Sequence, residues 1–190
     1  MPRTNDTRSR MVVSAALLIR EGGVSGTSFE KVIKHSGSPR GSISHHFPGG
    51  KNEMVRDAVA WAGEMATAAM KQGVERGDSA RTIFESVAGF YRSALVDTEF
   101  SAGCPIGSVA QERYDDEGMR SILKATFEDW RSVLADQLLA EGRTEQEAID
   151  LAELSVASVE GSILIARVDR STDSVDSVIR QVGPLLEQRS

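Results

Sequence analysis

This 190-residue chain has little material for disulfides or sulfur-based metal sites. Its one cysteine, Cys104, cannot form an internal disulfide, and an all-cysteine metal site is excluded. No apolar run approaches the roughly 20 residues that a membrane-spanning helix needs, and no apolar signal core follows Met1. These absences favour a protein of the reducing cytoplasm.

Aromatic residues are also scarce, at 5% of the chain, whereas hydrophobic residues make up 40% and charged residues 26%. The last two values are ordinary for a globular protein with a buried core. Runs of β-branched residues are rare, and Ala, Glu, Arg, Leu and Met are plentiful, which favours helices. Apolar residues recur at helical spacing in about nine segments. We therefore expect an all-α fold, with a three-helix head in residues 1–50 and a helical body in residues 51–190.

The net charge of -6 conceals an uneven distribution along the chain. Residues 1–56 hold nine basic and four acidic side chains, a balance of +5, and all three histidines. Residues 57–190 hold the other 13 basic and 24 acidic side chains, a balance of −11. A basic head on an acidic body indicates two modules with different partners.

Capping signals predict where several helices begin. Thr27 and Glu30 are spaced as a capping box for a helix over about 28–35, and Thr144 starts a second box for a helix over 145–168. Ser38 is the expected N-cap of a helix that begins at Pro39 and runs to about His46. The last helix is expected over about 173–188.

The segment 27–51 has the spacing of a helix-turn-helix. Two short helices flank a turn at Gly37, where a left-handed backbone is tolerated, and Val32 and Ile43 can pack across it. The second helix is short enough to project into a major groove. Its expected outward side chains are polar, as a groove-facing surface requires: Arg40, Ser42, Ser44 and His45.

Three motifs resemble the TetR family of bacterial repressors. The first is Thr27-Ser-Phe-Glu-Lys-Val-Ile33, followed by Gly37 and by Arg40-Gly-Ser-Ile-Ser-His-His-Phe-Pro-Gly-Gly-Lys51. The second and third are Gly103-Cys-Pro-Ile-Gly107 and Val159-Glu-Gly-Ser-Ile-Leu-Ile-Ala-Arg167. The last two are similar to the branch that includes the lincomycin- and flavonoid-responsive repressors of Bacillus.

The resemblance implies a homodimer that binds a palindromic operator and is released by a small effector. It implies no cofactor and no enzymatic activity. It assigns contacts with bases or phosphates to a set of head residues: Thr27, Ser28, Arg40, Gly41, Ser42, Ser44, His45, His46 and Lys51. Hydroxyl groups and a helix N-terminus suit an anionic oxygen, and Lys51 adds positive charge.

Two positions depart from the family pattern. Ser44 stands where Tyr is usual and has neither its reach nor its stacking face. Ile33 replaces a usually small residue between the two helices. Both departures affect the details of base recognition, and they leave open an alternative in which the head no longer binds DNA.

Other local patterns carry little chemistry. His45 and His46 are adjacent on a helix, so their side chains diverge and do not form a metal site. Gly49-Gly50-Lys51 lacks the upstream glycine and the following hydroxyl residue of a phosphate-binding loop. Two Ser-x-x-Lys matches, at Ser28 and Ser121, lack the companion motifs of serine hydrolases. Cys104 is read as a packed residue, with redox sensing as the alternative.

The body is expected to bind the effector between its helices, where apolar pockets with a few polar groups usually form. Candidate pocket residues are the aromatic and sulfur side chains at helical spacing: Trp61, Met65, Phe84, Tyr91, Phe100, Cys104, Phe127 and Trp130. By the family analogy, the effector is a small apolar or aromatic molecule.

The helix over 145–168 is apolar or small nearly all round, so it needs cover on two sides. The core covers one side, and a twofold partner is the simplest cover for the other side. A central core helix of a monomer would show the same apolar pattern. The expected dimer interface comes from this helix and the last one: Ser155, Ser158, Val159, Ser162, Ile165, Val178, Val182 and Leu186.

Two functions from different classes remain open at this point. The first is a ligand-responsive DNA-binding repressor of the cytoplasm, bound to the nucleoid when on its operator. The second is an all-α dimeric ligand-binding or enzymatic protein whose head has lost DNA binding.

Overall fold

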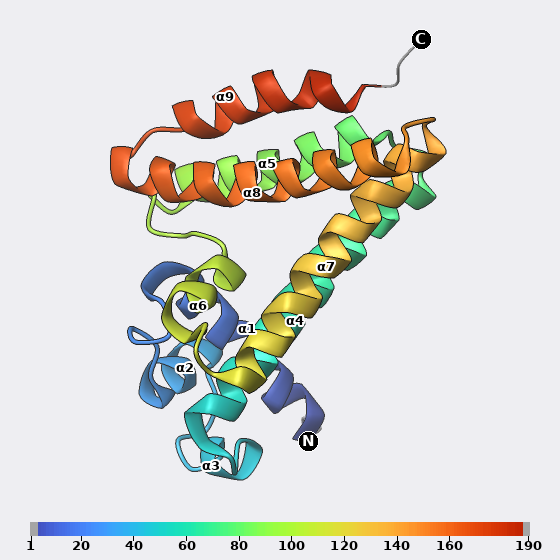
Figure 1. The fold of residues 1–190 in the computed structure, drawn as a ribbon. Coiled ribbons are helices and arrows are strands. Elements are labelled where there is room, and N and C mark those ends of the chain that lie inside the picture. Colours follow the sequence, from blue (N-terminus) through green and yellow to red (C-terminus); the bar gives the residue numbers. More distant parts are fainter. Residues whose placement is uncertain (1–3, 188–190) are drawn as a thin grey trace. The chain divides into compact units, whose positions relative to one another are not determined.

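A computed structural model describes residues 4–187 and confirms the all-α expectation for them. Over that range it contains nine α-helices, one short 3-10 helix and no strand (Figure 1). The helices are α1 (Thr4–Gly22), α2 (Phe29–Ser36), α3 (Ile43–His46), α4 (Gly50–Glu75), α5 (Ala80–Asp97), α6 (Pro105–Arg113), α7 (Glu117–Ala140), α8 (Glu145–Asp169), α9 (Asp173–Val182) and η1 (Gly183–Leu186). Among the described helices, none combines the length and the apolar character that crossing a bilayer requires.

The described chain forms two compact units that interleave along the sequence. Unit 1 comprises the described residues up to Glu64 together with Pro105–Leu123. Unit 2 comprises Met65–Cys104 together with the described residues from Lys124 onward. The long helices α4 and α7 each contribute residues to both units.

In unit 1, helix α1 packs against both α2 and α6 (Figure 1). The apolar residues of α1 that recur at helical spacing are buried, and so are the two residues predicted to pack across the turn: Met11, Val12, Ala15, Ala16, Ile19, Val32 and Ile43. Ile106 and Val109 of α6 are buried as well. The core of the N-terminal head therefore includes α6, a helix that begins at Pro105, more than fifty residues after the head ends at residue 50.

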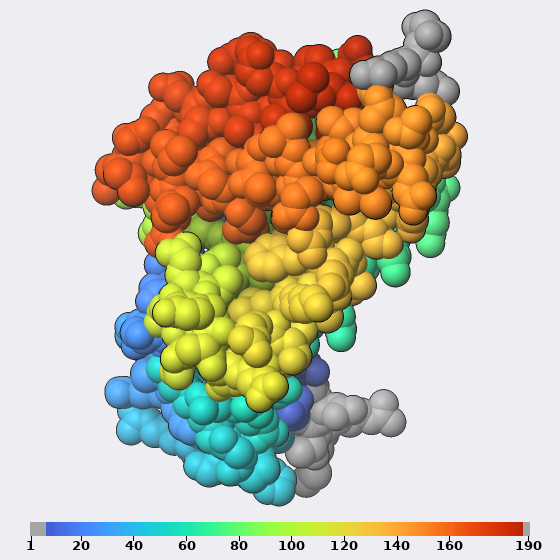
Figure 2. Space-filling model, viewed as in Figure 1, coloured from blue at the N-terminus to red at the C-terminus, as the bar shows by residue number. Residues whose placement is uncertain are grey.

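In unit 2, helices α5, α8 and α9 lie side by side, and η1 packs on α5 and α9 (Figure 1). The capping box at Thr144 is confirmed, with the Thr144 side chain and the Glu147 side chain each accepting from the other residue's backbone N–H. Side chains of α8 and α9 form one continuous surface in the space-filling view (Figure 2).

The expectation of a single helix over 173–188 is wrong. The α-helix ends at Val182, and Gly183–Leu186 continues as a 3-10 helix. Pro184 has no backbone N–H, and its ring clashes with the carbonyl four residues earlier in a continued α-helix. Residue 188 lies outside the described residues.

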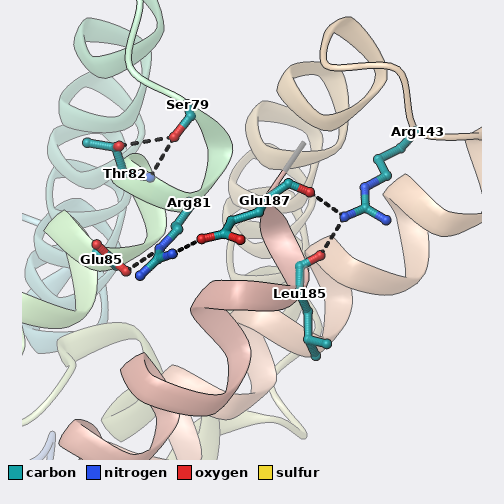
Figure 3. Close-up of polar contacts among 7 residues, drawn as sticks. All are labelled: Ser79, Arg81, Thr82, Glu85, Arg143, Leu185 and Glu187. Atoms are coloured by element: carbon teal, nitrogen blue, oxygen red, sulfur yellow. Dashed lines mark hydrogen bonds and ion pairs between the residues drawn. The ribbon is translucent and has the colours of Figure 1, made fainter. Parts of the chain in front are cut away.

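Two arginines tie this C-terminal turn to the rest of unit 2 (Figure 3). Arg81 of α5 forms ion pairs with both Glu85 and Glu187. Arg143, in the loop before α8, donates to the carbonyls of Leu185 at 2.8 Å and Glu187 at 2.6 Å. Leu185 and Glu187 are thereby held against α5 and the α7–α8 loop.

Candidate nucleic-acid interface

Helix α2 starts at an N-cap, but one residue later than expected. The cap is Ser28, whose hydroxyl accepts from the backbone N–H of Lys31 at 3.3 Å. The capping box at Thr27 is wrong because Thr27 is fully buried and its hydroxyl donates to the carbonyl of Gly23 at 2.8 Å. Among the residues assigned to phosphate contact here, Ser28 is therefore exposed and Thr27 is not.

The end of α2 is the turn that the sequence predicts. Gly37 has φ 63° and ψ 28°, the left-handed conformation that a β-carbon disfavours. Lys34 and His35 lie in the last turn of α2, where positive charge complements the helix dipole. Val32 and Ile43 are both buried, so the two helices share a core on either side of the turn.

Helix α3 is shorter than expected. It begins at Ile43 rather than at Pro39, and Pro39–Ser42 forms a turn closed by the Ser42 amide, 3.1 Å from the Pro39 carbonyl. The Ser42 hydroxyl donates to the same carbonyl at 2.7 Å. Gly41 disfavours a helix, and the Ser42 side chain offers a local alternative to it. Ser38 is not a cap, since its hydroxyl pairs with that of Ser36 at 2.8 Å.

The polar residues of this segment are largely accessible. Arg40, Gly41, Ser44 and His45 are exposed, whereas Ser42, His46 and Lys51 are half-buried. A one-turn helix thus presents polar and basic side chains to the surroundings. Arg3, which the charge balance of the head includes, lies outside the described residues.

Arg8 on α1 holds the end of α3 in place. Its Nε donates to the carbonyl of His46 at 3.3 Å, and its guanidinium carbon lies 5.1 Å from the centroid of the Phe47 ring. Its Nη2 pairs with Asp57 at 2.5 Å and Glu53 at 3.4 Å, both on α4. Arg8 therefore joins three helices behind the candidate recognition surface.

Partial burial of the Asp57 carboxyl raises its pKa, the nearby Glu53 carboxylate raises it further, and Arg8 opposes both effects. The arginine thus supports a carboxylate that is otherwise costly to ionise. Sequence reasoning missed Arg8 because its partners are 38 to 49 residues away. A basic residue on the polar side of the first helix was the only signal available.

The eight residues assigned to an effector pocket do not all lie in one unit. Trp61 belongs to unit 1, and Met65 is 53% exposed. Phe84, Tyr91, Cys104 and Trp130 are buried in unit 2, and Phe100 and Phe127 are half-buried there. The Phe127 and Trp130 rings meet edge to face at 5.5 Å.

Unit 2 also holds a polar cluster in a mostly apolar interior. The Tyr91 hydroxyl donates to Cys104 Sγ at 3.3 Å, and Cys104 hydrogen-bonds to Glu160 of α8. Burial raises the pKa of the Glu160 carboxyl above its ordinary value. Four buried polar atoms among the described residues of this unit have no hydrogen-bond partner, and Thr67 Oγ1 and Trp130 Nε1 are two of them. Buried polar atoms without a partner are costly in an apolar interior.

The expected dimer interface includes residues that the chain itself covers. Five of the eight, Ser155, Val159, Ser162, Val182 and Leu186, are buried in unit 2, so the chain itself covers their side chains. Ser158 and Val178 are half-buried, and Ile165 is 50% exposed. The helical period places Ser155, Val159 and Ser162 on one side of α8, and the structure shows that this is the core side. The apolar pattern alone did not identify the core side.

The opposite side of α8 carries an exposed apolar stripe. Its members recur at intervals of three and four residues, with one adjacent pair: Leu154, Ala157, Gly161, Leu164, Ile165 and Val168. Leu164 is 49% and Val168 77% exposed. The sequence therefore indicated correctly that α8 is apolar on two sides, and the structure identifies the uncovered side.

Two family models match the chain on either side of residue 60. Residues 12–58 match the bacterial regulatory proteins of the tetR family. Residues 80–181 match the C-terminal domain of LmrA/YxaF-like transcriptional regulators.

Curated relatives and solved structures agree with these matches. The chain is 40% identical over 185 residues to the HTH-type transcriptional regulator Rv0196 of Mycobacterium tuberculosis, covering 94% of this chain and 93% of the relative. It is 26% identical to LmrA of Bacillus subtilis, covering 96% and 98%. A TetR-family regulator from Agrobacterium tumefaciens has the same fold, with a TM-score of 0.83, 22% identity and coverage of 97% and 99%. The chain therefore belongs to the TetR family of helix-turn-helix, DNA-binding transcriptional regulators, in the group with an LmrA/YxaF-like C-terminal domain.

Proposed function

We propose that this regulator is a ligand-responsive repressor that binds a palindromic operator as a homodimer and is released by a small apolar or aromatic effector. The observation that carries the proposal is the α2–Gly37–α3 segment, whose exposed polar and basic residues lie in the part of the chain with a +5 balance. Neutralisation of phosphates requires positive charge at the binding surface, and the net charge of -6 on the whole chain does not alter this requirement.

Within this proposal, the DNA contacts divide into two kinds. Ser28, at the N-terminus of α2, and Lys51, near the start of α4, contact phosphates and set the position of the head. Arg40, Ser44 and His45, exposed around α3, read base edges in the major groove. Ser44 is shorter than the family's usual Tyr, so its contacts are local.

The exposed stripe on α8 supports the proposed homodimer. A row of Leu, Ile and Val side chains on a twofold surface is self-complementary, and Ala157 and Gly161 permit close approach of two helices. Two heads held at a fixed spacing match half-sites separated by whole turns of DNA.

The interior of unit 2 supports the proposed effector site. Buried aromatic rings provide apolar cover, and the Tyr91–Cys104–Glu160 cluster and the unpartnered Trp130 Nε1 provide polar groups. An effector acts only through its different affinities for the DNA-bound and free conformations.

DNA binding is tested by titrating the full chain against a duplex from its own upstream intergenic region, with random duplex as control. The Lys51→Ala variant is expected to bind both duplexes more weakly and to reduce the slope of log K against log salt by about 0.9. The Arg40→Ala variant is expected to lose mainly the preference for the upstream duplex. No preference by the wild-type chain at moderate salt would refute the proposal.

The homodimer is tested by light scattering on a matched pair of variants. Leu154, on the stripe, and Leu139, on α7, are both 42% exposed. We expect Leu154→Glu to give a monomer mass at micromolar concentration and Leu139→Glu to leave the dimer mass unchanged. A monomeric wild type, or equal behaviour of the two variants, would contradict the proposed interface.

A further inference from the structure

Glu112, near the end of α6, binds the turn between α1 and α2. Its Oε1 accepts from the Val24 amide at 2.8 Å, and its Oε2 accepts from the Ser25 amide at 2.9 Å and the Ser25 hydroxyl at 2.6 Å. One carboxylate thus uses both oxygens on two consecutive residues that are 87 and 88 positions away in sequence. All of these residues belong to unit 1.

Gly23 shows that the turn is shaped around this carboxylate. Its φ is +69°, and a β-carbon at this position would lie 2.0 Å from Glu112 Oε1. The backbone conformation favours glycine, and a β-carbon would in addition displace the Glu112 carboxylate from its position beside the turn. The Glu112 carboxylate is therefore part of the structure of this turn.

The electrostatics of the site favour the ionised carboxylate. Burial by itself raises the pKa of Glu112, but the hydrogen bonds from Ser25 and Val24 outweigh it and bring the pKa below its ordinary value. Hydrogen bonds to a charged acceptor are stronger than those between neutral groups.

The turn leads directly into the candidate DNA-binding segment. The Thr27 hydroxyl donates to Gly23 at 2.8 Å, and Lys31 Nζ donates to the Gly26 carbonyl at 2.6 Å. Ser28, the N-cap of α2, follows at once. A displacement of this turn therefore carries the N-terminus of α2 with it.

At its other end, α6 begins where the chain passes from unit 2 to unit 1. The other two passages, at residues 64–65 and 123–124, lie inside the continuous helices α4 and α7. The passage before Pro105 is different, because residues 101–104 are non-helical. Of the three covalent connections between the described units, it is the one without helical hydrogen bonds to hold it straight.

We propose that Glu112 is a positioning residue that couples the 101–104 connection to the helix-turn-helix through the Gly23–Thr27 turn. In this inference, which rests on the proposed DNA-binding function, a shift of α6 moves the N-terminus of α2 because the carboxylate fixes one to the other. By linkage, DNA binding at α2–α3 alters the dynamics of residues 101–107 through the same contact.

The test compares Glu112→Ala and Glu112→Gln with Glu117→Gln in the full chain. Glu117 is exposed in the same unit, so its substitution removes the same charge without touching the turn. Binding is measured by anisotropy on the upstream duplex. Hydrogen exchange is measured at Val24, Ser25 and residues 101–107, with and without that duplex.

We expect Glu112→Ala to bind DNA about fivefold or more weakly than Glu117→Gln, in the range of ordinary coupling. Glu112→Gln keeps one amide oxygen and should lie between them. In Glu112→Ala the Val24 and Ser25 amides should exchange faster, and the change that DNA causes in residues 101–107 should disappear. Should Glu112→Ala fail to fold, Ser25→Ala, which removes one of the three bonds, is expected to show the same changes at smaller size.

Two outcomes separate this inference from the proposed function. If the wild type binds DNA and the Glu112 and Ser25 variants match Glu117→Gln in affinity and exchange, the coupling role of Glu112 is refuted alone. If the wild type shows no preference for the upstream duplex, the proposed function fails and the coupling fails with it. In that case faster Val24 and Ser25 exchange in the variants still reports the contact itself.

Discussion

Removal of the Arg8 side chain should weaken DNA binding although Arg8 is not expected to contact DNA. Its guanidinium joins the His46 carbonyl at the end of α3, the Phe47 ring and two α4 carboxylates. The Arg8→Ala substitution breaks all four contacts. It also leaves Glu53 and Asp57 with their mutual repulsion unopposed.

The expected cost follows from the exposure of these groups. The Arg8 side chain is 39% exposed, and its two acidic partners are 30% and 29% exposed, so each ion pair contributes about 0.5 kcal/mol. The bond to the His46 carbonyl adds about 1 kcal/mol and the ring contact about 0.5 kcal/mol. Since one group makes all of these contacts, they are not fully additive, and we expect a loss of about 2 kcal/mol. For a chain of this size that lowers Tm by about 4–8 °C.

The assays are thermal unfolding by circular dichroism and DNA binding as a function of salt. We expect Arg8→Ala to reduce affinity without changing the salt slope, because no phosphate contact is lost. Lys51→Ala should instead reduce the slope. Arg10→Ala, which removes the same charge from an exposed position on the same helix, is the control.

The stability difference should also depend on pH. Because the Asp57 pKa is raised in the folded protein, the ionised carboxylate costs stability as pH rises through that pKa, and Arg8 reduces this cost. The difference in stability between wild type and Arg8→Ala should therefore be fully present at pH 7 and should become smaller as the pH falls through the raised pKa of Asp57. Equal Tm, affinity and pH profile for Arg8→Ala and Arg10→Ala would refute this reasoning.

Substitutions at three further positions test local features. Ser28→Ala should lower stability by about 1 kcal/mol through loss of the cap, whereas Ser28→Asp should keep stability and weaken DNA binding, as thermal unfolding and anisotropy can show. Gly37→Ala should destabilise by about 1 kcal/mol in chemical denaturation, because no atom lies near its missing β-carbon and the cost is conformational; an unchanged midpoint would contradict this. The wild type should lose stability as pH rises through the raised pKa of Glu160, and the Glu160→Gln variant should not. If the stability of the variant falls with pH in parallel with that of the wild type, the Glu160 carboxyl is not the cause of the loss.

Features that depend on neighbouring residues were predictable from the sequence. The left-handed turn at Gly37 and the capping box at Thr144 each involve residues within a few positions of one another. The buried face of α1 follows from helical spacing. Even here, competing local bonds misled the prediction at two positions: the Thr27 hydroxyl turns to Gly23, and Ser42 closes a turn where a helix was expected.

Features that depend on distant residues were not predictable. Helical spacing showed that α8 is apolar on two sides, but it did not show which side faces α5 and α9. The interface expectation therefore included the buried Ser155 and Val159 and left out the exposed Leu154 and Leu164. The contacts of Arg8 and Glu112 have no local signal, since their partners lie 38 to 88 residues away.

The sequence by itself determined the helical fold, the basic N-terminal head, the helix-turn-helix and the family, because composition, periodicity and short motifs are local properties of the chain. The tertiary structure alone decided that α6 belongs to the same unit as the head, that Arg8 supports α3 and that Glu112 binds the α1–α2 turn. The physical reason is that a polar contact between distant segments depends on where the packed cores bring the backbones. No spacing within a segment encodes that position.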